Sequence, residues 1–255
     1  VLPDIWKIAN VIPIFKKGDR HSTTNYRPVS LTSIVCKVME SIIREAIIGH
    51  VEINKLISTH QHGFLPKRST ATQLLETLEI WTDELDKGHS LDAIYLDFMK
   101  AFDTVPNKRL SVKLRNYGIN GKLLIWLESF LSDRTQQVTV NGIKSTVSKV
   151  ISGIPQGSVL GPIIFVLFIN DLPDVVNCGI KLFADDAKIY KTVHETSDCE
   201  QMQNDLSEME NWAKKWQMKF HPKKCKIMRL GNKNPLFDYK MHNSNNVISF
   251  EVCDV

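Results

Sequence analysis

The chain has 255 residues, of which 43% are hydrophobic and 24% are charged. This composition is that of an ordinary globular protein and excludes an intrinsically disordered chain. The longest apolar run, residues 163–169, is far shorter than the roughly 20 residues that cross a bilayer, so we expect no membrane partner. The formal net charge of +4 is only mildly basic, so the position of the charges must indicate the partner.

The sequence also indicates the cellular compartment of the protein and whether the chain is part of a longer one. Five cysteines without a CxxC pair predict reduced thiols and an intracellular protein. No signal peptide is visible. The chain begins at Val1 rather than at Met and ends at Val255 without an evident terminal element. These ends predict a piece of a longer protein.

The first third of the chain predicts a strand followed by two helices. The run Ala9–Phe15 predicts an edge strand, because Pro13 suits an edge and a basic turn follows. A helix is expected from about Thr32 or Ser33, and apolar residues at helical spacing predict its inner face: Val35, Val38, Met39, Ile42, Ile43, Ala46 and Ile47. A second helix is expected from the N-cap candidate Ser69 to Gly88, burying Leu74, Leu75, Leu78, Trp81 and Leu85.

The rest of the chain alternates strands with helices. We expect a buried strand over 91–98, helices over 106–117 and 122–131, and a hairpin over 134–150 that turns at Asn141-Gly142. A glycine-rich loop, 153–162, leads into a buried helix that ends at Asn170. A hairpin over 180–190, an amphipathic helix over 197–216 and a possible strand over 247–252 complete the pattern. The alternation predicts an α/β or α+β layer architecture over a mixed sheet.

Two adjacent acids, Asp185 and Asp186, lie at the turn of the hairpin over 180–190. Asp is common in tight turns, so the pair could form only a polar turn. Two carboxylates this close repel each other, however, and a divalent cation with a preference for oxygen ligands, Mg²⁺ or Mn²⁺, would neutralise them. Asp97 ends the expected strand over 91–98, and the three acids would converge if the strand and the hairpin are neighbours. Carboxylates gathered in this way can hold two metal ions for in-line phosphoryl transfer.

A basic run follows the expected helix over 197–216. Between Trp212 and Arg229 there are seven basic residues and no acid: Lys214, Lys215, Lys219, Lys223, Lys224, Lys226 and Arg229. A solvated basic face is one interpretation. A cationic patch with interleaved Trp and Phe also suits a nucleic acid backbone.

Six segments in order resemble the motifs of one family. Motifs A to D of reverse transcriptases are similar to AIYLDFMKAFDTV, SGIPQGSVLGPIIFVLFINDLP, KLFADDAKIY and WAKKWQMKFHPKKCKIMRLG. The preceding finger motifs of the non-LTR (LINE-like) retrotransposon branch resemble NVIPIFKKGDRHSTTNYRPVSLTSIVCKVMES and QHGFLPKRST. The resemblance runs from about Trp6 to Gly231. It implies an α+β, right-hand polymerase fold whose antiparallel palm sheet is backed by helices. Fingers would span 1–90, palm 91–230 with a fingers segment at about 106–150, and the start of a thumb 231–255.

The resemblance implies a role for each matching residue. Asp97, Asp185 and Asp186 would bind two Mg²⁺ ions (or Mn²⁺), with the Phe98 carbonyl beside them, and Lys224 would be the general acid for pyrophosphate.

Other residues would bind the substrates. Lys16 and Arg27 would reach the dNTP triphosphate, Phe102 would exclude a ribose 2′-OH, and Gln156 and Gly157 would line the nucleotide pocket. The template–primer would contact Lys67, Arg68, Lys214 and Lys215.

The function that the resemblance implies is RNA-directed DNA polymerisation with an RNA template, a DNA primer and dNTPs. Endonuclease and thumb regions would be joined covalently to this chain, and the site of action would be the nucleus. The alternatives are a catalytically inactive, truncated nucleic-acid-binding remnant of such an element, and a structural protein that only borrows the fold. A group II intron maturase and a telomerase subunit are alternatives among related polymerases, but the segments NYRPVSLTS and FADD favour the non-LTR branch.

Overall fold

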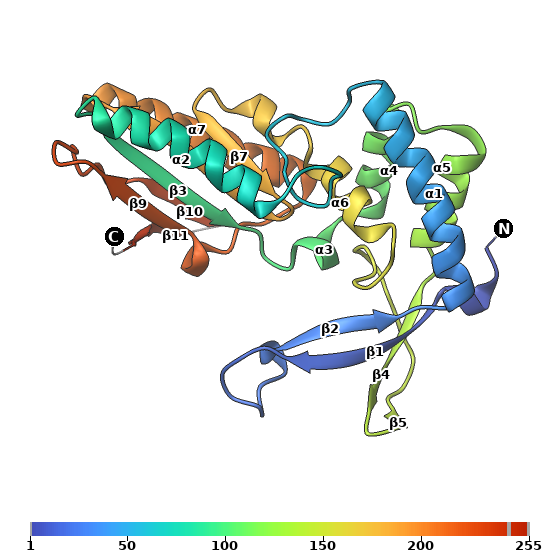
Figure 1. Ribbon diagram of the computed structural model, residues 1–255. Coiled ribbons are helices and arrows are strands. Elements are labelled where there is room, and N and C mark those ends of the chain that lie inside the picture. The colour runs from blue at the N-terminus through green and yellow to red at the C-terminus, as the bar shows by residue number, and fades with distance from the viewer. Residues whose placement is uncertain (1, 244–245, 254–255) are drawn as a thin grey trace. The chain divides into compact units, whose positions relative to one another are not determined.

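The computed structural model describes residues 2–243 and 246–253, which form two compact units. Unit 1 comprises the residues up to 56 together with 102–168, and unit 2 comprises 57–101 and the residues from 169 onward. Each unit therefore combines segments that are far apart in the sequence (Figure 1). The segment 57–90, expected in the fingers, falls in unit 2, and the assignment of fingers, palm and thumb stays a prediction.

The sheet of unit 1 contains β1 (Ile8–Phe15), β2 (Tyr26–Leu31), β4 (Thr135–Val140), β5 (Ile143–Lys144) and β6 (Ser148–Lys149). Its order is β2-β1-β4-β5, with β6 also paired to β4, so β1 is not the edge strand that we expected. Only residues 8–11 of β1 pair with β4, and Pro13 lies beyond that pairing. The missing N–H of Pro13 therefore costs no ladder hydrogen bond to β4.

The expected hairpin at Asn141-Gly142 is present. Both residues have positive φ angles, 49° and 80°, which match the tight two-residue turn that Asn-Gly favours. The helices of this part of the chain are α1 (Ile34–Ile53), α3 (Ala101–Thr104), α4 (Asn107–Asn116), α5 (Gly121–Leu131) and α6 (Gly161–Ile169). Residues 163–169 of α6 are fully enclosed, as expected for a helix that is apolar on every side.

The prediction of which residues α1 buries is largely wrong. Val35, Val38 and Ile42 are exposed, whereas Glu40 is completely buried. Periodicity shows which side chains share a stripe, but it does not show which part of a wide stripe is covered by other elements. The buried residues of α1 are Cys36, Glu40, Ile43, Ile47 and Val51.

The sheet of unit 2 has the order β12-β9-β3-β8-β7. Its strands are β3 (Ser90–Asp97), β7 (Gly179–Phe183), β8 (Asp186–Val193), β9 (Lys226–Leu230) and β12 (Glu251–Val252). The pairs β9/β3, β3/β8 and β8/β7 are antiparallel, and the short pair β12/β9 is parallel. The predicted antiparallel sheet is confirmed.

Two long helices pack against this sheet (Figure 1). They are α2 (Thr70–Asp86), which contacts β3 and β7, and α7 (Thr196–Trp216), which contacts β8. Ser69 caps α2 as expected, because its hydroxyl accepts a hydrogen bond from the Thr72 amide. The expected stripe of α7 is buried from Met202 to Trp212. On α2 the prediction fails for Leu74, Leu75 and Leu78, which are exposed.

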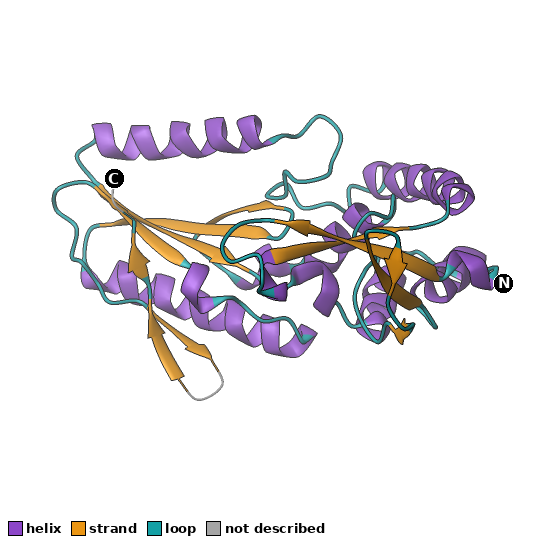
Figure 2. Ribbon diagram, turned by 90° about the horizontal axis from the view of Figure 1, so that it is seen from below, coloured by secondary structure: helices purple, strands orange, loops and turns teal. Residues whose placement is uncertain are grey.

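The core under α2 is a cluster of Trp81, Leu91, Ala93 and Tyr190. A two-stranded ribbon of β10 (Lys240–Asn243) and β11 (Asn246–Ser249) lies beside α7 (Figure 2). Single turns of 3-10 helix are Asp4–Trp6, Thr23–Asn25, Leu172–Val175 and Pro222–Lys224. Among the helices that the structure describes, none combines the length and the apolar character needed to cross a membrane.

Candidate active site

The three predicted acids are brought together by strand pairing in unit 2. Asp97, the last residue of β3, lies directly opposite Asp186, the first residue of β8. Directly opposed residues of antiparallel strands have Cα atoms only about 4.5–5.5 Å apart. Asp185 precedes Asp186 in the turn between β7 and β8. The strand and the hairpin are therefore neighbours, and their carboxylates share one end of the sheet.

The electrostatics of this cluster reflect the crowding of like charges. Desolvation by the surrounding protein raises the pKa of Asp186, and the negative charges of Asp185 and Asp97 raise it further. The positive charge of Lys224 acts in the opposite direction. Lys224 Nζ lies 3.0 Å from both carboxylate oxygens of Asp97. The lysine side chain is 57% exposed and that of Asp97 is 27% exposed, so solvent screens this ion pair.

The donor set fits a hard divalent cation. Carboxylate oxygens are the ligands that Mg²⁺ and Mn²⁺ prefer. Desolvation and then the charges of Asp185 and Asp97 raise the pKa of Asp186, and a bound cation would oppose both effects. Among the described residues, no three His, Cys, Asp or Glu side chains are already close enough to hold a metal ion. The Lys224 ammonium instead lies against Asp97.

A folded-back segment carries Lys224 to the end of β3. The Met99 amide donates to the Lys219 carbonyl and the His221 amide donates to the Asp97 carbonyl, each at 2.7 Å. The buried Phe98 ring stacks on Phe220 with centroids 4.4 Å apart. These contacts attach residues 219–224 to the strand that ends in Asp97. The role of the Phe98 carbonyl at a metal stays a prediction.

The predicted template–primer residues of unit 2 differ in what they contact. Lys67 is exposed, and Lys214 and Lys215 are exposed in the last turn of α7. Arg68 is only partly exposed, and its Nη1 donates hydrogen bonds to the carbonyls of Ser58 and Gln61. The Arg68 guanidinium therefore already fixes the loop before α2.

The predicted triphosphate residues lie in unit 1 on the paired strands β1 and β2. Arg27 is opposite Ile14, and Lys16 follows β1 directly, with its amide donating to the Asn25 carbonyl. Both side chains are exposed. The register thus brings these two cations to the same end of a two-stranded ribbon.

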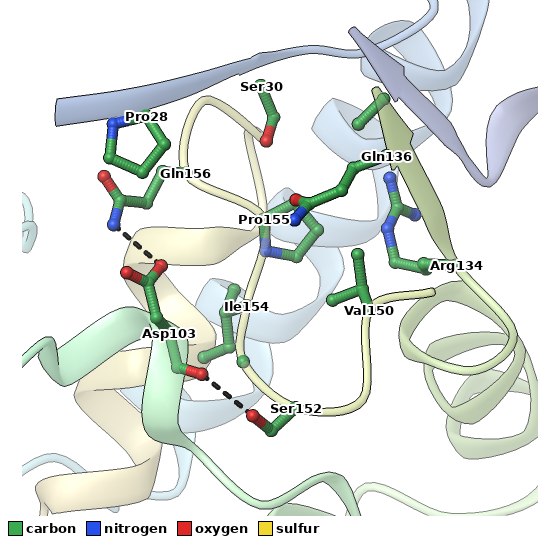
Figure 3. A pocket seen from close by; sticks show the side chains of 12 residues that line it. Pro28, Ser30, Asp103, Arg134, Gln136, Val150, Ser152, Ile154, Pro155 and Gln156 are labelled. Carbon is green, nitrogen blue, oxygen red and sulfur yellow. Dashed lines mark hydrogen bonds between the residues drawn. The ribbon is translucent and has the colours of Figure 1, made fainter. Parts of the chain in front are cut away.

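Phe102, Gln156 and Gly157 also lie in unit 1. The Phe102 ring is partly buried and stacks on Phe165 with centroids 4.5 Å apart. Gln156 Nε2 donates to the Asp103 carboxylate at 2.9 Å, on the wall of a small pocket that Arg134 and Gln136 also line (Figure 3). Sequence reasoning missed Asp103, although it belongs to the segment 93–105 that resembles motif A.

The glycine-rich loop packs against protein backbone. Gly157 has φ of +106°, and a Cβ there would lie 2.7 Å from the Ser30 carbonyl oxygen. The Ser30 amide donates to the Gln156 carbonyl at 2.8 Å. The lack of a side chain at Gly157 is thus needed for contact with β2.

The fold is shared with solved polymerases. A telomerase from Candida tropicalis, solved in complex with a fragment of telomeric RNA, matches 95% of this chain and 43% of its own length with a TM-score of 0.66 and 13% sequence identity. An apo telomerase from the same organism, truncated of its C-terminal domain, matches 98% of the chain and 54% of that truncated chain with a TM-score of 0.63 and 14% identity. At this identity the likeness defines the fold class alone.

Sequence comparison supplies the family. The reverse transcriptase (RNA-dependent DNA polymerase) family matches residues 14–247, and the chain belongs to this family. The RNA-directed DNA polymerase from mobile element jockey of Drosophila melanogaster is 30% identical over 91% of the chain, which spans 26% of that relative. A probable RNA-directed DNA polymerase from transposon X-element of the same organism is 30% identical over 84% of the chain and 24% of its own length. The chain thus spans about a quarter of these relatives.

Proposed function

We propose that this chain is the polymerase region of a non-LTR retrotransposon reverse transcriptase, which extends a DNA primer with dNTPs on an RNA template. One observation carries the proposal: Asp97 and Asp186 are paired across β3 and β8, with Asp185 beside them, in a chain of the reverse transcriptase family.

The roles of the acids follow from their chemistry. Asp97, Asp185 and Asp186, with the Phe98 carbonyl, would hold two Mg²⁺ ions. When bound, these ions supply Lewis acidity toward the primer 3′-OH and neutralise charge on the transferred phosphoryl group. Lys224 would then donate a proton to the leaving pyrophosphate, which requires its ammonium to leave Asp97.

The remaining residues would bind and select the substrates. Lys16 and Arg27 are exposed cations that suit a triphosphate, and the planar guanidinium can bind phosphate oxygens in pairs. Phe102 would reject a ribose 2′-OH by contact with its ring, and Gln156 and Gly157 would line the nucleotide pocket. Lys67, Lys214 and Lys215 would contact phosphates of the template–primer, so this binding should weaken as salt concentration rises. Arg68 would contribute through the loop that it fixes.

The test is primer extension by the purified chain on an RNA template with Mg²⁺ and dNTPs. We expect the wild type and Asp174→Asn, a control at an exposed acid, to extend the primer, and Asp185→Asn to bind the duplex within a few-fold of wild type without extension. Binding without extension by the wild type would favour the inactive remnant. Loss of binding together with extension in Asp185→Asn would assign that residue a structural role.

A further inference from the structure

A buried glutamine contacts the turn that carries the paired acids. Gln61 has no exposed surface, and its side-chain oxygen accepts hydrogen bonds from the Gly63 amide at 2.7 Å and the Ala184 amide at 3.0 Å. Ala184 directly precedes Asp185. Both donors are N–H groups, so the oxygen of the carboxamide must face them. The backbone of the acidic turn is thus bonded to a residue 123 positions earlier.

Ala184 adopts a conformation that needs external support. Its φ of 53° lies in the left-handed region, which costs an alanine about 1–2 kcal/mol. Strained residues of this kind persist where surrounding contacts over-determine them. The Gln61 oxygen supplies one such contact to the Ala184 amide, which would otherwise be a buried donor without an acceptor.

The segment around Gln61 leaves the turn little freedom. It runs parallel to β7: the Leu182 amide donates to the His60 carbonyl at 2.8 Å, and the His62 amide donates to the Leu182 carbonyl at 2.9 Å. A Cβ at Gly63 would lie only 2.2 Å from the Ala184 nitrogen, so the two backbones are in direct contact. The guanidinium of Arg68 also donates hydrogen bonds to the Ser58 and Gln61 carbonyls of this segment.

The Gln61 carboxamide contributes more than packing. Its Nε2 is buried and has no hydrogen-bond partner among the described residues. A buried, unpaired amide costs free energy, so an apolar side chain of the same size would suit a position that only fills space. The property that the site uses is therefore the acceptor oxygen.

We propose that Gln61 is a positioning residue for Asp185 and Asp186, and that it acts by holding the Ala184 amide through its side-chain oxygen. The catalytic consequence rests on the proposed function, whereas the hydrogen bond can be tested without it. A displacement of the acids by about 1 Å would be enough to lower the rate about 100-fold.

The experiment compares Gln61→Met, which keeps the size but removes the acceptor, with Gln61→Glu, which keeps an acceptor oxygen. Gln73→Met is the matched control, because Gln73 is also buried in unit 2 and the same change is made there. Hydrogen exchange of the Ala184 amide is followed by NMR. In Gln61→Met we expect exchange about 10- to 100-fold faster than in wild type, from the loss of one buried hydrogen bond. Gln61→Glu and Gln73→Met should stay close to wild type.

Steady-state kinetics and Mn²⁺ binding provide the second readout. Gln61→Met should lower kcat and weaken Mn²⁺ binding while KM for the dNTP changes little, because the nucleotide residues lie on other elements. Gln61→Glu should recover part of the loss.

The outcomes separate the inference from the proposed function. Unchanged Ala184 exchange in Gln61→Met overturns the positioning role, whether or not the wild type extends primers. Faster exchange with unchanged kcat and Mn²⁺ affinity also overturns it. If Gln61→Met does not fold, the test is made on Gln61→Glu. Rapid exchange of the Ala184 amide in a folded Gln61→Glu protein would refute the inference that the side-chain oxygen of residue 61 holds this amide. A wild type that never extends primers removes the proposed function but leaves the exchange test intact.

Discussion

Replacing Lys224 by Met should strengthen the binding of a divalent cation at the three acids. The Lys224 ammonium lies 3.0 Å from both oxygens of Asp97, so an incoming cation must displace it or tolerate its charge. Lys224→Met removes both the competition for Asp97 and the repulsion between the two cations.

The expected gain in Mn²⁺ affinity depends on how far the ion pair between Lys224 and Asp97 is exposed to solvent. The Lys224 side chain is 57% exposed, and an exposed ion pair contributes about 0.2–1 kcal/mol. Removing that competition, together with a screened repulsion of similar size, should tighten Mn²⁺ binding by about 2- to 30-fold. The gain should shrink at high ionic strength, because salt screens both terms.

The assay is a titration of Mn²⁺ in which the free ion is followed by electron paramagnetic resonance. Lys223→Met is the matched control, since the neighbouring Lys223 is also exposed and makes no ion pair with the acids among the described residues. We expect Kd to fall in Lys224→Met and to stay near the wild-type value in Lys223→Met. Weaker or unchanged binding in Lys224→Met, or equal changes in both variants, would refute the reasoning.

Three further predictions concern other residues. Glu40→Leu should lower the free energy of unfolding by about 2–5 kcal/mol, because the amides of Val159 and Leu160 lose their acceptor. Glu40→Gln, which keeps an acceptor oxygen, should lower it less. Equal denaturation midpoints for Glu40→Leu and wild type would contradict this prediction. Lys188→Met should stabilise the protein at neutral pH by at most about 3 kcal/mol, because burial lowers the pKa of Lys188 to about 8 from 10.5. The unfolded chain keeps this proton up to a higher pH than the folded protein does, so the destabilisation of the wild type by the buried charge is complete below pH 8 and declines between pH 8 and pH 10.5. If urea unfolding shows the same difference in free energy of unfolding between Lys188→Met and wild type throughout this range, the prediction is wrong. Phe102→Val should admit ribonucleotides in primer extension, and unchanged rejection of rNTPs would remove the gate role.

Much of the fold could be predicted from local sequence signals. The Asn141-Gly142 turn, the Ser69 cap and the buried stripe of α7 depend on neighbouring residues, so the sequence carries enough information for them. The same holds for the acidic turn, because two short β-prone runs around two Asp residues already specify a hairpin. The convergence of Asp97 with that hairpin required one assumption about strand order, which the pairing of β3 with β8 bears out.

Other features depend on contacts between distant segments. The exposure of Val35, Val38 and Ile42, and of the leucines on α2, could not be read from periodicity, because the pattern does not show whether another element covers a face.

The same is true of the polar contacts: Glu40 at the Val159 amide, Gln61 at the Ala184 amide and Lys224 on Asp97 join residues 119 to 127 positions apart. The sequence alone therefore determined most of the helices, the two hairpins, the family resemblance and the three acids, since these depend on local propensity and motif order. It did not predict the short strands β2 and β9. The tertiary structure decided which buried polar groups hold the acidic turn and the glycine-rich loop, because a buried hydrogen bond forms only where packing brings its donor and acceptor together.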